Sequence, residues 1–376
     1  MSRKNENILI TAAFCGFLAV MLLCYLFLPK EAFSQREKRY LAEKPVFSWE
    51  NLASGELGEQ IEDYLSDHIP GRNFYVGMNA GFDLITGRQV TGDVRLLEGD
   101  RIVEAPVRWN SQVVEKNMKA INDFSTVLGR EVNLMIVPSA GWASESKRVR
   151  GLDLFSREEY PDGNFIAQIY SMAGDMVCVM DAVSVMEGRE EYYYRTDHHW
   201  NSRGAYEVYR FCMESLGRYY APEDAFQVET ISGFQGSTFT RSALWTVPGE
   251  MLELWHSDSA LTVQNAEQEG LHEGPFYRER LEEADKYTVY LDGNHSVVRI
   301  DNPGQKGNGK LLVIRDSYSN CLGCFLAESY ETVVLVDLRY YKKPVSELCA
   351  QENFDDILIC YSIGNFMTDT NLVWLR

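Results

Sequence analysis

Ser317 is the clearest candidate nucleophile in this 376-residue sequence, because of its place in the run LLVIRDSYSN. The apolar residues of the run predict a strand, and the residues after Ser317 predict a helix. A serine at such a junction lies at the carboxyl end of a parallel strand, where open α/β sheets place their sites. The free N–H groups of the helix can stabilise an oxyanion there. The same position also suits a serine that only caps the helix, so both interpretations stay open.

The second candidate group is Asp197, His198 and His199 in the run YYYRTDHHWNSRGAYEVY. These residues precede an expected helix, so we place them in a loop between a strand and a helix. An aspartate and a histidine in one loop can orient and activate a serine supplied from elsewhere in the chain. In an extended segment, residues two apart share one side, so Asp197 and His199 can converge while His198 points away.

Two other interpretations of this loop stay open. The histidines could be structural side chains that pack beside the neighbouring tyrosines, or they could bind a metal ion together with Asp197. The remaining histidines are scattered without the spacing of metal ligands, so we expect no metal site. Cys321 and Cys324 form a C-x-x-C pair without a second such pair, and buried small side chains are the simpler interpretation.

Short apolar strands separated by helices dominate the chain after residue 130, which is typical of a parallel sheet covered on both faces. The expected helices cover 110–127, 165–172, 202–215, 319–329 and 345–349, and the first ends before a glycine. The expected strands begin at Val132, Met176, Lys310, Glu331 and Asp356. We therefore predict an α/β domain with a central, mostly parallel sheet.

Other segments have weaker patterns. Residues 57–65 predict a helix with apolar residues on one side, and residues 94–103 predict a hairpin. Residues from about 221 to 309 are irregular apart from a short strand expected at Tyr287. We interpret that stretch as an insertion lying over the sheet edge.

The run from Ile8 to Pro29 contains no charged residue and is long enough to cross a membrane as a helix. Its length and the lack of a small-residue cleavage site favour an uncleaved anchor over a cleavable signal peptide. Basic residues lie on both sides of the run, and we expect the large domain to lie outside the cytoplasm. The expected division is a membrane anchor over 1–30, a stalk and packing arm over 31–95, and the α/β domain over 96–376.

Composition excludes one large class of function. The chain has 36 Lys and Arg against 55 Asp and Glu, which gives a net charge of −19. Such a surface would repel the phosphates of nucleic acid, so we expect no nucleic-acid partner. With 45% hydrophobic residues, the composition is that of a globular protein with a sizeable core.

The run from Thr196 to Asn201, followed by Gly204-Ala205-Tyr206, resembles the motif after which DHHW proteins are named. Later runs resemble that family in the same order: GNHSVVRIDN, LLVIRDSYSN, FLAESY and VDLRYY. The upstream stretch with Tyr64, Asp67 and Arg72 does so too. The resemblance therefore covers nearly all of the chain after the apolar run.

The resemblance implies an SGNH-hydrolase-like fold, a flavodoxin-like three-layer domain, related to the domains of alginate O-acetyltransferases. In those domains an Asp-x-His pair precedes the serine, which implies a circularly permuted sheet. By this resemblance Asp197 matches the orienting acid, His199 the base and Ser317 the nucleophile. Arg315 departs from the pattern, because motifs of the Gly-Asp-Ser type have glycine at that position.

Four further residues are expected near a substrate. Asn365 follows the last predicted strand, where SGNH proteins supply an asparagine to the oxyanion. Tyr318 follows the candidate nucleophile. Arg339 and Tyr340 end a neighbouring strand and could contact a substrate, although Arg339 could equally pair with Asp337 or Asp355.

The resemblance implies acyl (acetyl) transfer or ester hydrolysis on a cell-surface polysaccharide, without a cofactor. It also implies a multi-pass membrane protein as the partner that supplies acyl groups across the membrane. The alternative from another class is a non-catalytic glycan-binding or scaffold protein of the cell envelope that retains the fold. Reaction of Ser317 with a serine-directed reagent would distinguish the two.

Overall fold

The computed structural model describes residues 3–86, 90–91, 93–144 and 160–376, and the chain divides into two compact units, Met1–Thr86 and Gly87–Arg376. The first unit holds the apolar helix α1 (Arg3–Phe27), within which Asn5–Phe27 is long and apolar enough to cross a membrane. One such helix near the N-terminus is what a membrane anchor or a signal sequence requires. The rest of the unit consists of a two-stranded pair and three helices: β1 (Phe33–Ser34), β2 (Arg39–Tyr40), α2 (Trp49–Ser54), α3 (Glu56–His68) and α4 (Arg72–Ile85).

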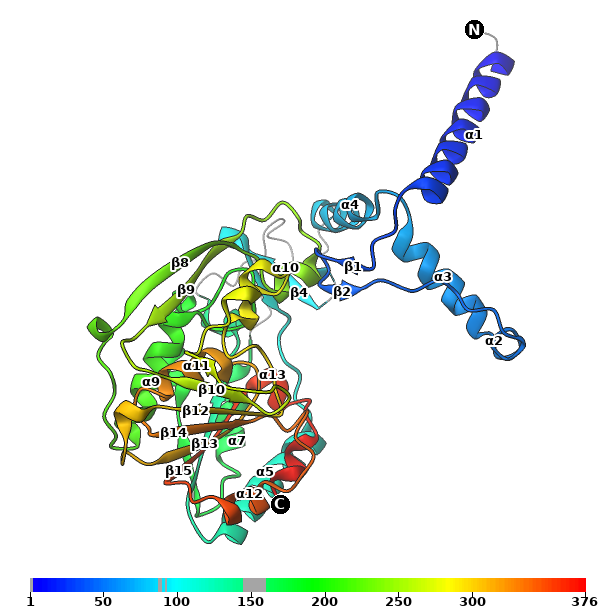
Figure 1. Cartoon of the computed structure of the whole chain (residues 1–376). Coiled ribbons are helices and arrows are strands. Elements are labelled where there is room, and N and C mark those ends of the chain that lie inside the picture. The colour runs from blue at the N-terminus through cyan, green and yellow to red at the C-terminus, as the bar shows by residue number, and fades with distance from the viewer. Residues whose placement is uncertain (1–2, 87–89, 92, 145–159) are drawn as a thin grey trace. The chain divides into compact units, whose positions relative to one another are not determined.

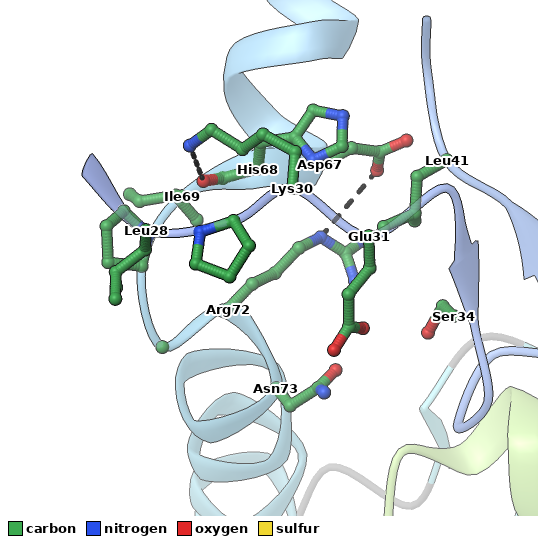
Figure 2. Close-up of a pocket in the computed structure, with 13 residues that line it drawn as sticks. Leu28, Lys30, Glu31, Ser34, Leu41, Asp67, His68, Ile69, Arg72 and Asn73 are labelled. Carbon is green, nitrogen blue, oxygen red and sulfur yellow. Dashed lines mark hydrogen bonds and ion pairs between the residues drawn. The ribbon is translucent and has the colours of Figure 1, made fainter. Parts of the chain in front are cut away.

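Ion pairs hold the first unit together after α1. Asp67, at the end of α3, accepts hydrogen bonds from Arg39 and from the backbone N–H of Ala42. Figure 2 shows the pocket beside it, about 220 Å³ in volume, where Lys30 donates to the His68 carbonyl and Arg72 lies against Asp67. The segment that follows α1 is therefore joined to α3 through Arg39 and to α4 through the ion pair of Glu37 with Arg72.

The second unit is built on a sheet whose described strands run in the order β11-β10-β12-β14-β13-β15-β6-β7. Strands β14, β13, β15, β6 and β7 are mutually parallel, whereas β12 is antiparallel to β14. Figure 1 shows β12, β14, β13 and β15 side by side. The parallel strands are β6 (Val132–Val137), β7 (Val177–Met180), β13 (Lys310–Arg315), β14 (Thr332–Val336) and β15 (Asp356–Ser362).

Both faces of this sheet are covered, because its strands are apolar on both sides. In β13, Leu311 and Val313 pack into one core with α9 and α11, while Leu312 and Ile314 pack into another with α5, α7 and α12. The major helices are α5 (Ser111–Leu128), α7 (Asp162–Tyr170), α9 (Ser202–Ser215), α11 (Ser319–Leu326) and α12 (Val345–Gln351). The shorter ones are α6 (Ala140–Ala143), α8 (Ala182–Met186), α10 (Ser237–Ser242) and α13 (Ile363–Phe366).

Most of the predicted elements of this domain are confirmed. The α/β class, the five parallel strands and the helices at 110–127, 165–172, 202–215, 319–329 and 345–349 all occur, with ends shifted by a few residues. Helix α5 ends before Gly129, whose φ of 63° is the left-handed conformation that favours glycine. The hairpin predicted at 94–103 is β4 (Val94–Leu97) and β5 (Arg101–Glu104), joined on its outer side by β3 (Val90–Thr91).

The predictions for residues 221–309 need correction. The short strand expected at Tyr287 is wrong, since Lys286–Val289 forms a 3-10 turn and Leu291 and Asp292 then adopt positive φ angles. The region also contains regular strands: β8 (Gln227–Phe234) pairs with β9 (Glu250–His256), and β10 (Thr262–Asn265), β11 (His272–Glu273) and β12 (Val297–Asp301) extend the central sheet. Three short strands of the region therefore extend the edge of the central sheet, while β8 and β9 form a separate pair.

Gly204, in the first turn of α9, packs against the backbone of Tyr192. A Cβ at this position would lie 2.3 Å from the Tyr192 carbonyl oxygen. Alanine favours helices more than glycine does. Gly204→Ala should nevertheless lower the free energy of unfolding by about 1–3 kcal/mol, because the backbone at Tyr192 or in α9 must move to admit the new methyl group. Urea denaturation of the full chain, followed by circular dichroism, measures the change.

Gly163→Ala in α7 is the matched control. A Cβ there would meet Trp142 at an ordinary 3.5 Å, so the free energy of unfolding should stay equal or rise by up to about 1 kcal/mol. Equal stability of the two variants would contradict the role given to Gly204.

Candidate active site

Ser317 lies where β13 meets α11, at the carboxyl edge of the parallel strands. The preceding residue, Asp316, is buried and fixes this junction. One of its carboxylate oxygens accepts from the Tyr318 N–H, and the other accepts from the N–H and the hydroxyl of Ser362 at the end of β15. The turn that carries Ser317 is thereby joined to the neighbouring strand.

Ser317, His199 and Asp197 form a hydrogen-bonded series. The His199 Nε2 lies 2.8 Å from the Ser317 Oγ, and the His199 Nδ1 lies 2.5 Å from the Asp197 Oδ1. Because an ionised carboxylate only accepts hydrogen bonds, the Nδ1 carries the proton and the Nε2 is free to accept one from the serine. The three side chains are nearly buried, at 9%, 5% and 1% exposure respectively. The sequence-predicted nucleophile, base and orienting acid are thus brought together.

Asp197 is held by more than the imidazole. Its carboxylate also accepts from the backbone N–H groups of His199 and Ser237, at 2.9 and 2.6 Å. Burial acts to raise the pKa of this carboxyl, but the charges of His199 and His198 and these hydrogen bonds hold the pKa well below its usual range. Asp197 therefore remains an anion that fixes the orientation of His199.

The loop before the triad is anchored from two other elements. Glu250, the first residue of β9, accepts from the backbone N–H groups of Arg195 and Thr196 at 2.9 and 2.7 Å. Arg101, in β5, donates to the carbonyls of Tyr193 and Tyr194. Neither Glu250 nor Arg101 belongs to a motif, and nothing in the sequence distinguishes them from other charged residues.

The expectation that His198 and His199 lie in an extended segment needs correction. Residues 195–199 form a bend and not an extended strand, and the His198 and His199 rings lie side by side with centroids 3.8 Å apart. The His198 Nδ1 lies 2.6 Å from the Ser237 Oγ. His198 therefore faces Ser237, while His199 faces Asp197 and Ser317.

Aromatic rings surround the His199 imidazole. Tyr287 stacks on it in parallel, with centroids 3.9 Å apart and 5° between the planes. Tyr318 packs at 5.0 Å, and its hydroxyl donates to the His198 carbonyl. Nothing in the sequence around Tyr287 indicates this contact, and the run YTVYLD predicts only a strand.

The four other expected residues have different surroundings. The Asn365 Nδ2 donates to the Asp316 carboxylate at 2.8 Å, which uses one of its two hydrogens. Tyr318 is buried with its hydroxyl occupied, and Tyr340 is 54% exposed. Arg339 donates to Asp337 through Nε and Nη2, at 2.9 and 2.6 Å, so the structural ion pair that the sequence left open is formed.

Arg315, which departs from the glycine of related motifs, is completely buried. Its Nη1 donates to the Asn294 Oδ1 at 2.9 Å and lies 3.8 Å from Asp337. Burial lowers the pKa of this guanidinium, while the charge of Asp337 opposes the shift. The side chain reaches past the end of β14 towards Asn294, and its bulk does not lie between His199 and Ser317.

Asp197, His198 and His199 also satisfy the distance requirement of a metal site, since their ligand atoms lie within 4.8 Å of one another. In the structure these side chains are hydrogen bonded within the protein, to each other, to Ser237 and to Ser317. The arrangement is complete as an acid, base and nucleophile series, which is the chemistry it supports best.

Comparisons with known proteins agree with this fold. Residues 145–336 match the model of the DHHW protein family, and no curated protein matches the chain. A DHHW family protein from Eubacterium siraeum superposes with a TM-score of 0.65 at 20% identity, over 76% of this chain and 95% of that one. Bacillus cereus PatB1 superposes with a TM-score of 0.60 at 20% identity, over 74% of this chain and 98% of that one. PatB1 with a sulfonyl adduct superposes with a TM-score of 0.61 at 21% identity, over 75% of this chain and 99% of that one. These likenesses show a shared fold.

The environment of His198 predicts a measurable titration. Burial lowers the pKa of His198 from 6.5, and the charges of His199 and Arg241 lower it as well. The charges of Asp197 and Glu104 act to raise the same pKa. We expect an NMR titration of the full chain to place the His198 midpoint below 6.5, with His198→Gln assigning the resonance. Its contribution to stability is then present above the unfolded pKa and is lost as the pH falls through the folded pKa. A midpoint at or above 6.5 would contradict this environment.

Proposed function

Because this chain belongs to the DHHW protein family, whose model matches half of it, and carries a serine, histidine and aspartate in hydrogen-bonded series, we propose that it transfers or hydrolyses acyl groups. The proposed substrate is an acetyl ester of a cell-surface polysaccharide, and the proposed place of action is outside the cytoplasm. The observation that carries the proposal is the unbroken series from Ser317 through His199 to Asp197.

In the first half of the proposed reaction, the Ser317 Oγ attacks the carbonyl carbon of the acetyl ester while its proton passes to the His199 Nε2. The tetrahedral intermediate then collapses, the bond to the leaving oxygen breaks, and His199 returns the proton to that oxygen. In the second half, a sugar hydroxyl or water attacks the acyl carbon while His199 takes its proton, the bond from that carbon to the Ser317 Oγ breaks, and His199 returns the proton to the serine. Asp197 stabilises the imidazolium in both halves.

The negative oxygen of the tetrahedral intermediate needs donors close to Ser317. The N-terminal end of α11 begins two residues after Ser317 and presents its positive end there. The Asn365 Nδ2 keeps one hydrogen beyond the one it gives to Asp316. We therefore assign Asn365 and the start of α11 to the oxyanion.

Two observations support an acyl-serine chemistry. PatB1, which shares the fold, has been solved with a sulfonyl adduct. In this chain Ser317 keeps 9% exposure beside the His199 Nε2, so a small electrophile can reach it. The choice between a sugar hydroxyl and water as acceptor, and the multi-pass membrane protein that would supply acetyl groups, rest on the family resemblance.

Labelling with a sulfonyl fluoride tests this function. Methanesulfonyl fluoride should modify Ser317 in the full chain, detected by peptide mass spectrometry, and the labelling should survive EDTA. His199→Gln removes the base and should slow both labelling and acyl transfer from an acetyl ester by about 100-fold or more. Circular dichroism checks that each variant is folded.

His198→Gln is the matched control. Its imidazole faces Ser237, so labelling and acyl transfer should stay within a few fold of the unaltered protein, with any loss visible as a lower melting temperature. A folded protein whose Ser317 stays unlabelled would favour the non-catalytic scaffold. If the His198 variant were the inactive one, the assigned base would be wrong.

The proposed location has its own test. If α1 spans the membrane with the second unit outside, protease added to intact cells stripped of their wall should digest that unit. A cytoplasmic protein should stay intact in the same sample, which shows that the membranes are closed. Protection of the second unit would exclude this topology.

A further inference from the structure

A pocket of about 230 Å³ lies between the strands of residues 221–309 and the end of α11. Its walls include Trp255, Phe276, Leu261 and Pro275, which offer apolar surface. Its polar lining includes Glu328, two residues beyond the end of α11. Since a helix rises 1.5 Å per residue, Glu328 lies roughly 14 Å along the chain direction from Ser319, where α11 begins.

Glu328 is an unusual carboxylate, because it is 4% exposed and, in the part of the chain that the structure describes, has no basic partner. Its two oxygens accept from the hydroxyls of Ser257 and Ser259, both at 2.6 Å. Burial raises the pKa of Glu328, while these two hydrogen bonds oppose the shift. A buried carboxylate that keeps its charge without a cation is costly, so a cationic donor would stabilise it.

The cluster of Glu328, Ser257 and Ser259 can accept hydrogen bonds but has few to give. Both serine hydroxyls already donate to the carboxylate, and the Ser259 N–H donates to the Ser257 Oγ. The remaining capacity of these atoms is the lone pairs of their oxygens. The chemistry selects a ligand that brings N–H or O–H donors and disfavours an anion.

The two basic residues that line the pocket do not change this selection. Arg278 donates to both oxygens of Glu229, at 2.7 Å each, and the His256 Nε2 lies 2.9 Å from the same carboxylate. The hydrogen bonds of both side chains are therefore made to Glu229 and not to Glu328. Of the two carboxylates that line the pocket, Glu273 is exposed to water, whereas Glu328 is buried without a countercharge among the described residues.

The pocket is connected to the triad through packed rings. His256 contacts Phe276, Phe276 contacts Tyr290, Tyr290 contacts Tyr287, and Tyr287 stacks on His199, with successive centroids 4.9, 5.9, 5.2 and 3.9 Å apart. The pocket therefore packs against the same core as the Tyr287 ring, at the other end of α11 from Ser317. A polymer that presents one unit to Ser317 could place another unit in this pocket.

We propose that this pocket is a second glycan subsite, which binds a sugar unit carrying a free amino group. The ammonium group donates to Glu328 and its two serines, and the apolar face of the sugar ring packs on Trp255 and Phe276. The inference deepens the proposed function by naming a substrate class, and it rests on that function for the meaning of the binding. Binding itself does not require Ser317.

The test compares two oligosaccharides that differ at the amino group. A glucosamine hexamer should bind the full chain at least tenfold more tightly than an N-acetylglucosamine hexamer, measured by titration calorimetry at physiological salt. Glu328→Gln should remove that preference, because the amide carries no charge. The variant should fold, since glutamine can accept from one serine and donate to the other.

Glu279→Gln is the matched control, because it removes the same charge from an exposed residue outside the pocket. It should leave the preference unchanged, which separates the pocket from the general attraction of a chain of net charge −19. A second variant, Trp255→Phe, should reduce the change in tryptophan fluorescence that binding of the glucosamine hexamer causes.

The outcomes are distinct. Equal binding of the two hexamers, or a preference that survives Glu328→Gln, would overturn the amino-sugar subsite. Sulfonyl labelling of Ser317 in Glu328→Gln should match the unaltered protein, so loss of the preference with intact labelling supports the subsite. If the preference for the glucosamine hexamer is present but Ser317 cannot be labelled, the subsite is supported and the proposed catalytic function is contradicted.

Discussion

The His199 imidazole is the point at which two distant parts of the chain must meet, since its partner Ser317 is 118 residues away. A hydrogen bond of 2.8 Å tolerates little displacement, so both segments have to be fixed independently before the series can form. On one side, Asp316 joins the serine turn to β15 through Ser362. On the other, Glu250 and Arg101 hold the loop that carries the histidines.

The two segments are also joined directly by a reciprocal pair of hydrogen bonds. The Trp200 indole N–H donates to the Tyr318 carbonyl, and the Tyr318 hydroxyl donates to the His198 carbonyl. Both rings are buried and pack edge to face at 5.2 Å. The residues that flank the histidine and the serine thus lock the two backbones together, which explains why Tyr318 serves the site as support and not as an exposed substrate contact.

The sheet could be predicted from the sequence because its strands leave a local pattern, whereas the grouping of Asp197, His199 and Ser317 rested on the family resemblance as well. Apolar runs such as LLVIR and ILICYS show strands buried on both faces, and the serine and the Asp-x-His pair are adjacent to predicted element ends. The strands β8 to β10 alternate weakly and are paired mainly with one another or at the sheet edge, so their apolar signal is low. The supports Glu250, Arg101 and Tyr287 act through distant contacts, which no local spacing reveals.

Arg315 shows how the site accommodates a bulky residue where related motifs have glycine. A fully buried guanidinium requires a countercharge, and Asp337 at the end of β14 supplies it while also accepting from Arg339. Asn294, just before β12, accepts from the same guanidinium and from the Asn320 amide in α11. Arg315 therefore ties the carboxyl ends of β13 and β14 to the start of β12 and to α11. Arg315 in place of glycine therefore changes which residues support the turn that carries Ser317. The Arg315 side chain makes no direct contact in the hydrogen bond between Ser317 and His199.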